Sequence, residues 1–401
     1  MQTRYNFKPA RQRLLLSCIC QPDAAIGADK SAKIQAMLLE GLFAPVTTPF
    51  YADGAPFFKK LEHNVDRYSR TPIAGLVVLG STGEAVMLSD AESREVLAVA
   101  AAAAAAHKVL VAGVGRESVA GTLTLAEQAA ELRYDAVLVR TPYFYRPQMH
   151  RQSAGEGSQP AVQREMLTYY RAVADRSPLP VLLYSIPACT GYDLPVDVIA
   201  ELAQHSNIIG LKDSSGNVQR IAAVVERTRD VKRAATVTPV FAAATARMLD
   251  ANTHAEAGAT FVSADSLGAG GSALAVAPAR PPMKTRSKEV GFQVLAGSAQ
   301  TVLASLQAGA AGAILGFADC APQACYEVLA AWKDRDADLS REKQERIAAA
   351  ARRIAGGLGI AGIKFACDLN GYYGGSPRLP LLPLTAEEKS EVAVLMEDMR
   401  N

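Results

Sequence analysis

Long apolar runs are absent from this sequence of 401 residues. The most apolar stretch, residues 97–106, consists mainly of alanine and ends in His107 and Lys108, which is typical of a water-soluble helix rather than of a membrane span. Neither sign of charge dominates, because 42 basic residues oppose 40 acidic ones. A partner that is a nucleic acid or a membrane surface is therefore not expected.

Histidine is also scarce, with five residues in the whole chain, and none lies at metal-ligand spacing from a second ligand. We therefore expect neither a metal site nor a bound cofactor. The six cysteines are scattered through a long chain and form no disulfide framework, which suits a reducing compartment.

Residues 1–40 are predicted to be an N-terminal extension. Four basic residues precede the first acidic residue, Asp23. An arginine-rich leader without acids resembles a mitochondrial transit peptide. The alternative is an unstructured tail on a cytoplasmic protein, because the segment is poor in serine.

From Gly41 onward, short apolar runs alternate with helix-like stretches. A parallel (β/α)8 barrel is the fold that eight such repeats predict, and runs rich in Val, Ile and Leu agree with strands buried on both faces. The eight predicted strands are Phe43–Val46, Leu76–Leu79, Val109–Ala112, Ala136–Val139, Val181–Tyr184, Ile208–Leu211, Gln293–Leu295 and Ala313–Leu315.

The barrel is predicted to cover residues 41–340, and a C-terminal helical segment, 341–401, follows it. Predicted helices are Asp90–Ala106, Ala120–Glu131, Met166–Arg176, Pro195–Gln204, Val218–Arg229, Arg341–Ala355 and Thr385–Arg400.

Two insertions interrupt the repeat. Residues 231–290 are of low complexity, rich in Ala, Thr, Ser, Pro and Gly, which predicts a loosely ordered segment before the seventh strand, on the amino-terminal face of the barrel. Residues 151–163 follow the fourth strand and lie on the catalytic face, where a lid and a plain surface loop are both compatible with the sequence.

Lys212 ends the sixth predicted strand, at a position where an aliphatic side chain is usual. Such a lysine is either ion-paired at the rim or a reactive amine. Burial favours the neutral amine, which attacks carbonyl groups to form Schiff bases.

Other strand ends carry further polar groups. Gly-Ser-Thr-Gly-Glu (80–84) offers backbone N–H groups, two hydroxyls and a helix start, which suit a carboxylate, although any tight turn with a hydroxyl N-cap has this composition. Tyr184 ends the strand before that of Lys212. It is either a core aromatic or, beside a Schiff-base lysine, a proton carrier.

Four motifs occur in order at these strand ends: Gly-Ser-Thr-Gly-Glu (80–84), Thr-Pro-Tyr-Phe-Tyr-Arg-Pro (141–147), Leu-Leu-Tyr-Ser-Ile-Pro-Ala-Cys-Thr-Gly (182–191) and Gly-Leu-Lys-Asp-Ser-Ser-Gly (210–216). This pattern resembles the dihydrodipicolinate synthase / N-acetylneuraminate lyase family of class I aldolases that handle pyruvate. Within the family it is most similar to 4-hydroxy-2-oxoglutarate aldolase.

The resemblance implies roles for individual residues. Lys212 would be the Schiff-base lysine and Tyr184 the acid/base tyrosine. The remaining residues would bind substrate: Ser81 and Thr82 the pyruvyl carboxylate, Ser185 and Ser214 the outer pocket, and Tyr143 and Tyr145 as nearby hydroxyls. Members of the family are commonly homotetramers in which a tyrosine of the strand-four loop reaches into the partner's site.

Two positions, Cys189 and Phe144, depart from the family's pattern, and Arg140 is unusual for its strand. Cys189 stands where dihydrodipicolinate synthases place an arginine for the second substrate's carboxylate, and a thiol cannot form that bidentate ion pair. Phe144 stands where the relay tyrosine is expected. Arg140 interrupts an otherwise aliphatic strand, and carboxylate binding is the only role that we can suggest for it.

The sequence therefore favours a Schiff-base lyase that cleaves 4-hydroxy-2-oxoglutarate to pyruvate and glyoxylate. A 2-keto-3-deoxy sugar acid aldolase or an enzyme like dihydrodipicolinate synthase is the alternative within the family. A catalytically weakened homologue with a binding or regulatory role is an alternative of another class, motivated by Phe144 and the insertions.

Overall fold

The computed structural model describes residues 36–145, 161–250 and 283–399. Eight parallel strands close a barrel in the order β1-β2-β3-β4-β5-β6-β9-β10, which confirms the predicted (β/α)8 fold and all eight of its strands. Their bounds are β1 Gly41–Ala44, β2 Gly75–Val78, β3 Val109–Gly113, β4 Ala136–Arg140, β5 Val181–Ser185, β6 Ile208–Asp213, β9 Gln293–Ala296 and β10 Gly312–Ile314.

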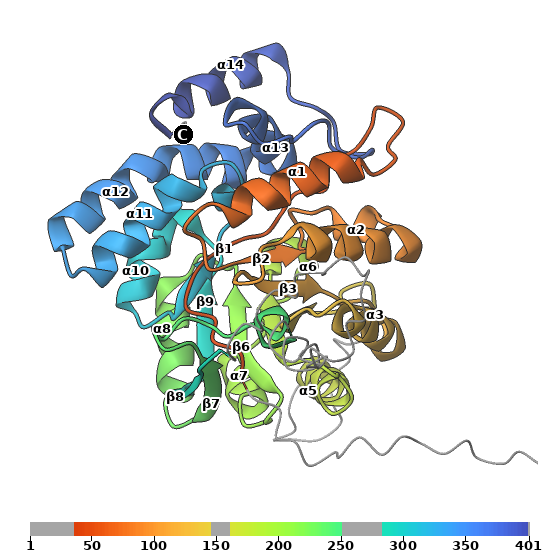
Figure 1. Cartoon of the computed structure of the whole chain (residues 1–401), viewed down its shortest axis with the longest axis vertical. Helices are drawn as coiled ribbons and strands as arrows, with labels where there is room; N and C mark the ends of the chain where they lie inside the picture. The colour runs from red at the N-terminus through yellow and green to blue at the C-terminus, as the bar shows by residue number, and fades with distance from the viewer. Residues whose placement is uncertain (1–35, 146–160, 251–282, 400–401) are drawn as a thin grey trace, which may run out of the picture. The chain divides into compact units, whose positions relative to one another are not determined.

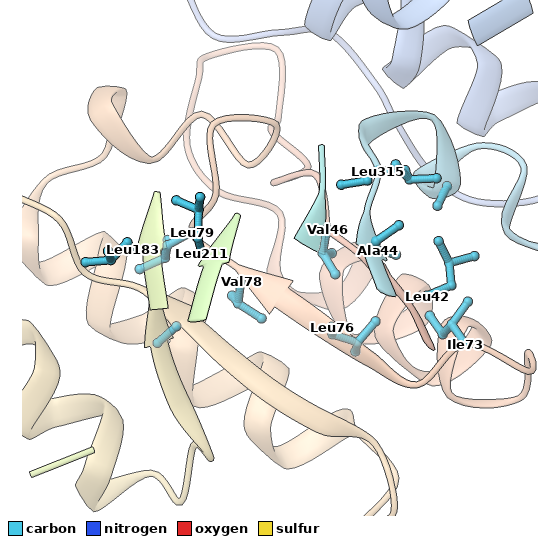
Figure 2. Packing of buried hydrophobic residues seen from close by; sticks show 14 of the residues in the cluster. Leu42, Ala44, Val46, Ile73, Leu76, Val78, Leu79, Leu183, Leu211 and Leu315 are labelled. Atoms are coloured by element: carbon cyan, nitrogen blue, oxygen red, sulfur yellow. The ribbon is translucent and has the colours of Figure 1, made fainter. Parts of the chain in front are cut away.

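Alternate side chains of each strand enter two separate cores, because successive residues of a strand point to opposite faces. Leu42 and Ala44 of β1, with Leu76 and Val78 of β2, pack outward against the helices (Figure 2). Phe43 belongs to a second cluster inside the barrel, together with Tyr184. Residues that follow each other in a strand, such as Leu42 and Phe43, therefore belong to different cores.

The helices surround the strands, as Figure 1 shows. After the barrel strands, α11 and α12 pack on each other, and a π-helical turn, η5 (Ala351–Gly357), leads to α13 and α14. The predicted C-terminal helices correspond to α12 with η5 and to α14. The helices are α1 Phe58–Ser69, α2 Asp90–Ala103, α3 Val119–Glu131, α5 Ala161–Ala174, α6 Pro187–Thr190, α7 Val196–Leu202, α8 Val218–Arg227, α10 Val302–Gln307, α11 Pro322–Lys333, α12 Ala337–Ala350, α13 Gly359–Leu369 and α14 Ala386–Leu395.

The insertion at 231–290 is not loosely ordered at its ends, and that prediction is wrong there. Strands β7 (Arg233–Val237) and β8 (Arg286–Val290) form an antiparallel pair, and Ala36 bridges to Ala235 beside them. Ala235, Val237 and Val290 are buried in the cluster inside the barrel. The paired strands therefore bury apolar surface that the composition of the segment did not predict.

Hydrogen bonds place the described first part of this insertion, up to residue 250, on the amino-terminal face, as predicted. Arg247 donates to the carbonyls of Ala104 at 2.9 Å and of Lys108 at 2.5 Å, in the loop between α2 and β3. Asp135, just before β4, accepts from the N–H groups of Leu110 and Ala246, each at 2.8 Å. Because these loops lead into strands, they lie opposite the catalytic face.

Three predictions fall on residues outside the described part of the chain: the leader up to residue 35, most of the insertion at 151–163, and residues 251–282 of the insertion at 231–290. In the described ranges, no helix combines the length and the apolarity that crossing a membrane requires. The same ranges hold no group of three or more His, Cys, Asp or Glu side chains arranged to bind a metal ion.

Candidate active site

A β-bulge in β6 determines which side chains face the barrel interior. Val181 pairs with Ile208 but Leu182 pairs with Gly210, so Ile209 is an extra residue in β6. The phase of alternation shifts there. Leu211 consequently packs outward, and Lys212 joins the inward set directly beside Tyr184, its register partner on β5.

Lys212 and Tyr184 form the centre of the site. Lys212 is only 4% exposed, and its Nζ lies 4.3 Å from the centroid of the Tyr184 ring. The Tyr184 hydroxyl is 3.3 Å from Oγ of Ser81, within hydrogen-bonding distance. No carboxylate of a described residue forms an ion pair with Lys212. The Lys212 amine is thus buried next to the Tyr184 ring, whose hydroxyl is within hydrogen-bonding distance of Ser81.

The turn that carries Ser81 and Thr82 is held by buried polar contacts. Thr48 donates its hydroxyl hydrogen to the carbonyl of Gly83 at 2.7 Å. Glu84, at φ 56, forms a fully buried ion pair with Lys364 of α13 at 2.5 Å and accepts from the N–H of Arg378. The C-terminal segment therefore fixes the turn that positions Ser81.

The helix that the sequence predicted directly after this turn is only a short 3-10 turn. N–H groups of Gly83 and Glu84 close the turn on the carbonyls of Gly80 and Ser81, and only a 3-10 turn, η1 (Ala85–Met87), follows. Helix α2 begins later, at Asp90. The hydroxyls of Ser81 and Thr82 are consequently the stronger candidates for a carboxylate than the helix end.

Ser185 does not lie where the sequence predicted. It follows Tyr184 directly, so its side chain is on the other face of β5, where its hydroxyl donates to Asp193 at 3.1 Å. Asp213, next to Lys212, faces the same way and pairs with Arg220 at 2.7 Å. Ser185 and Asp213 therefore stabilise the ends of β5 and β6 on the outer face of the barrel. Ser214, in contrast, lies on the inward side, against Gly297.

The aromatic loop after β4 points away from the barrel interior of its own chain. Tyr143, Phe144 and Tyr145 are 36%, 69% and 58% exposed. Glu117 holds the loop by accepting from the N–H of Tyr143 at 2.9 Å and of Phe144 at 3.0 Å. Among the described residues, neither tyrosine of this loop forms a hydrogen bond with Lys212 or Tyr184, so these exposed hydroxyls are not joined to the site within the chain.

Two groups that interact electrostatically with Lys212 flank the site. Cys189 is exposed at the surface, yet partial desolvation raises the pKa of its thiol, and Lys212 opposes that shift. Asp319 follows β10, is fully buried, and its carboxyl oxygens accept no hydrogen bond from a described residue. Burial raises the pKa of Asp319 well above its usual range, again against the influence of Lys212. Sequence reasoning missed Asp319.

A cavity next to Tyr184 is lined by two arginines. Arg116 and Arg140 share its wall with Ser81 and Tyr184. Arg140 was singled out from the sequence, but Arg116 was missed, although it closely follows the end of β3. Burial lowers the pKa of Arg116, and the charge of the nearby Arg140 contributes to that shift in the same direction.

A comparison with protein families gives a match to the Dihydrodipicolinate synthetase family over residues 38–235 and 282–399. The chain belongs to this family. Most of the insertion, 236–281, lies outside the family's pattern. Members are class I aldolase-like enzymes that depend on pyruvate, and this chain is one of them, as the resemblance predicted.

Individual relatives agree with membership of the dihydrodipicolinate synthetase family. The 4-hydroxy-tetrahydrodipicolinate synthase of Methanothrix thermoacetophila is 26% identical over 90% of this chain and 97% of its own length. The structure of dihydrodipicolinate synthase DapA-2 from Bacillus anthracis has a TM-score of 0.68 at 21% identity and covers 90% of this chain and 99% of its own. A monomeric dihydrodipicolinate synthase variant has a TM-score of 0.67 at 20% identity over 90% of this chain and 97% of its own, which supports the fold alone.

Proposed function

We propose that the protein is a Schiff-base aldolase that cleaves a 4-hydroxy-2-oxo acid, with 4-hydroxy-2-oxoglutarate as the favoured substrate and pyruvate and glyoxylate as products. The observation that carries this proposal is the buried Lys212 amine 4.3 Å from the ring of Tyr184 at the catalytic end of the barrel. A buried lysine beside a proton carrier is the arrangement that imine chemistry requires.

The reaction begins when the Lys212 amine attacks C2 of the oxo acid. Loss of water from the carbinolamine gives an iminium ion, which withdraws electrons from the C3–C4 bond. The departing water carries away the proton of the Tyr184 hydroxyl, so Tyr184 can then take the proton of the 4-hydroxyl; the C3–C4 bond breaks, and the aldehyde leaves. The enamine then takes a proton at C3, and water releases pyruvate from Lys212.

The proton needs a path to and from the imine. The Tyr184 hydroxyl and Ser81 Oγ, 3.3 Å apart, supply two adjacent groups that can hold it. Ser81 and Thr82 also bind the pyruvyl carboxylate in this proposal, which keeps the C2 carbonyl close to Lys212. No bound cofactor is needed, since the covalent imine itself activates the substrate.

Synthesis of a dihydrodipicolinate precursor is the second candidate, because relatives carry the name 4-hydroxy-tetrahydrodipicolinate synthase. Cys189 argues against it, since the thiol supplies no cation for the second substrate's carboxylate at that position.

A panel of 4-hydroxy-2-oxo acids, assayed for pyruvate release, tests the proposal. We expect turnover with 4-hydroxy-2-oxoglutarate and its loss in Lys212→Arg. Turnover that is faster with a longer 2-keto-3-deoxy sugar acid would move the substrate to that class. Condensation of pyruvate with aspartate semialdehyde, without cleavage of any panel member, would favour the second candidate. If no substrate reacts, the result would favour a catalytically weakened homologue with a binding or regulatory role.

A further inference from the structure

Three inward-facing residues form a row across neighbouring strands at the catalytic end. Arg140 of β4 is in register with Tyr184 of β5, which is in register with Lys212 of β6. Arg140 belongs to the inward set because Ala136 and Leu138, at alternate positions of β4, lie in the cluster inside the barrel. Neighbouring strands are about 5 Å apart, so Arg140 lies on the order of 10 Å from Lys212 along this row.

The space for the Arg140 side chain is built into the adjoining loop. A Cβ at Gly115 would lie 2.7 Å from Cγ and 2.7 Å from the backbone nitrogen of Arg140. Any residue other than glycine would therefore displace the arginine. The side chain crosses Gly115 and contributes to the wall of the cavity that Ser81 and Tyr184 also line.

The positive charge in this wall is only partly compensated. Nη1 of Arg140 donates to Glu117 at 2.7 Å, whereas Nε and Nη2 donate to no described residue. Arg116 has Asp90 at 3.6 Å as its ion-pair partner, and Asp90 is 95% exposed. Among the described residues, Arg140 thus pairs only with Glu117 and Arg116 only with the exposed Asp90, which leaves Nε and Nη2 of Arg140 available for a second anion.

We propose that Arg140, supported by Arg116, binds the distal carboxylate of a dicarboxylic 2-oxo acid whose C2 is attached to Lys212. The inference rests on the proposed function and deepens it by defining the substrate class. A guanidinium binds a carboxylate through two parallel hydrogen bonds, and a short diacid extending past Tyr184 from Lys212 lies along the row. Arg140 would thereby supply the cation that Cys189 cannot.

The test compares two five-carbon probes that cannot be cleaved: 2-oxoglutarate, and 2-oxopentanoate, which lacks the distal carboxylate. The concentration that gives half-maximal borohydride trapping on Lys212 is measured for each by intact mass spectrometry. Wild type should prefer 2-oxoglutarate. In Arg140→Gln that preference should fall about 10- to 100-fold through 2-oxoglutarate alone, since a charged hydrogen bond is lost. Arg116→Gln should act in the same direction but less strongly.

Glu117→Gln is the matched control, because it breaks the ion pair from the other side and leaves Arg140 in place. It should retain the preference for the diacid. The proposal is overturned if wild type shows no preference, or if Arg140→Gln weakens both probes equally, as a role in loop structure or in binding the C1 carboxylate would require. Failure of the Schiff-base chemistry on which the proposed function rests looks different, since wild type would then trap neither probe nor pyruvate. If the protein is instead a condensing enzyme, wild type would trap pyruvate without preferring 2-oxoglutarate to 2-oxopentanoate.

Discussion

At the scale of single residues, the Tyr184 hydroxyl carries the chemistry that follows imine formation. Tyr184→Phe should lower turnover by about 10²- to 10⁴-fold with a smaller change in the Michaelis constant, because proton transfer is felt mainly in the transition state. Tyr170→Phe is the control: this buried tyrosine of α5 donates to the carbonyl of Val139 at 3.3 Å, in the outer core. Equal losses in both variants would assign Tyr184 to packing.

Phe144, also considered as a single residue, stands where a relay tyrosine is expected and cannot transfer a proton. Phe144→Tyr should raise turnover several-fold or more if the missing hydroxyl limits proton transfer from a neighbouring chain. Turnover numbers for Phe144→Tyr, Tyr143→Phe and Tyr145→Phe decide the matter. A neutral Phe144→Tyr together with a slow Tyr143→Phe or Tyr145→Phe would show that another hydroxyl of the loop already supplies the path.

Residue types and order predicted much of the site, but not which way each side chain faces. Lys212, Tyr184 and Ser81 come together as the motifs indicated. Ser185 was placed in the pocket although it directly follows Tyr184, and strict alternation along β5 would have assigned it to the other face. The bulge at Ile209 is different: no feature of the apolar run reveals it, because it arises from pairing with β5.

At the scale of elements, the eight barrel strands were predictable because each is a continuous apolar run. The pair β7–β8 was not. Its strands are short, contain several polar or charged residues and lie far apart in the sequence, so neither shows the alternation of a half-buried strand by itself. Their stability comes from pairing with each other and from packing under the barrel.

This arrangement changes what deletion of the insertion should do. Replacing all of 231–290 by a Gly/Ser linker removes Val237 and Val290 from the inner core and Arg247 from its carbonyl partners, so the melting temperature should fall clearly. A deletion confined to 251–282 removes none of these contacts and should leave the melting temperature nearly unchanged.

Catalysis should respond differently from stability. The Michaelis constant of both deletion variants should stay within a few-fold of wild type while they remain folded, because the insertion lies on the face opposite the site. A folded variant without activity would contradict that separation.

At the scale of the whole molecule, we expect a homotetramer built from dimers, as the family resemblance implies. The exposed aromatic loop at 143–145 is one surface of the described chain that fits such a contact, since aromatic side chains are enriched in interfaces. Analytical ultracentrifugation should give a tetramer, and Phe144→Asp should shift it toward smaller species. A wild-type monomer at micromolar concentration would contradict the predicted tetramer. Tyr143 and Tyr145 could then not contribute to the active site of a neighbouring chain.

The barrel buries the Lys212 amine at its catalytic end, where we expect it to form an imine with pyruvate. Borohydride added with pyruvate should attach one reduced pyruvyl unit to the peptide that contains Lys212, and Lys212→Arg should abolish the attachment. Lys364, the other fully enclosed lysine near the site, is paired with Glu84 and should stay unmodified. Labelling at Lys364, or no labelling of the wild-type protein, would contradict the account.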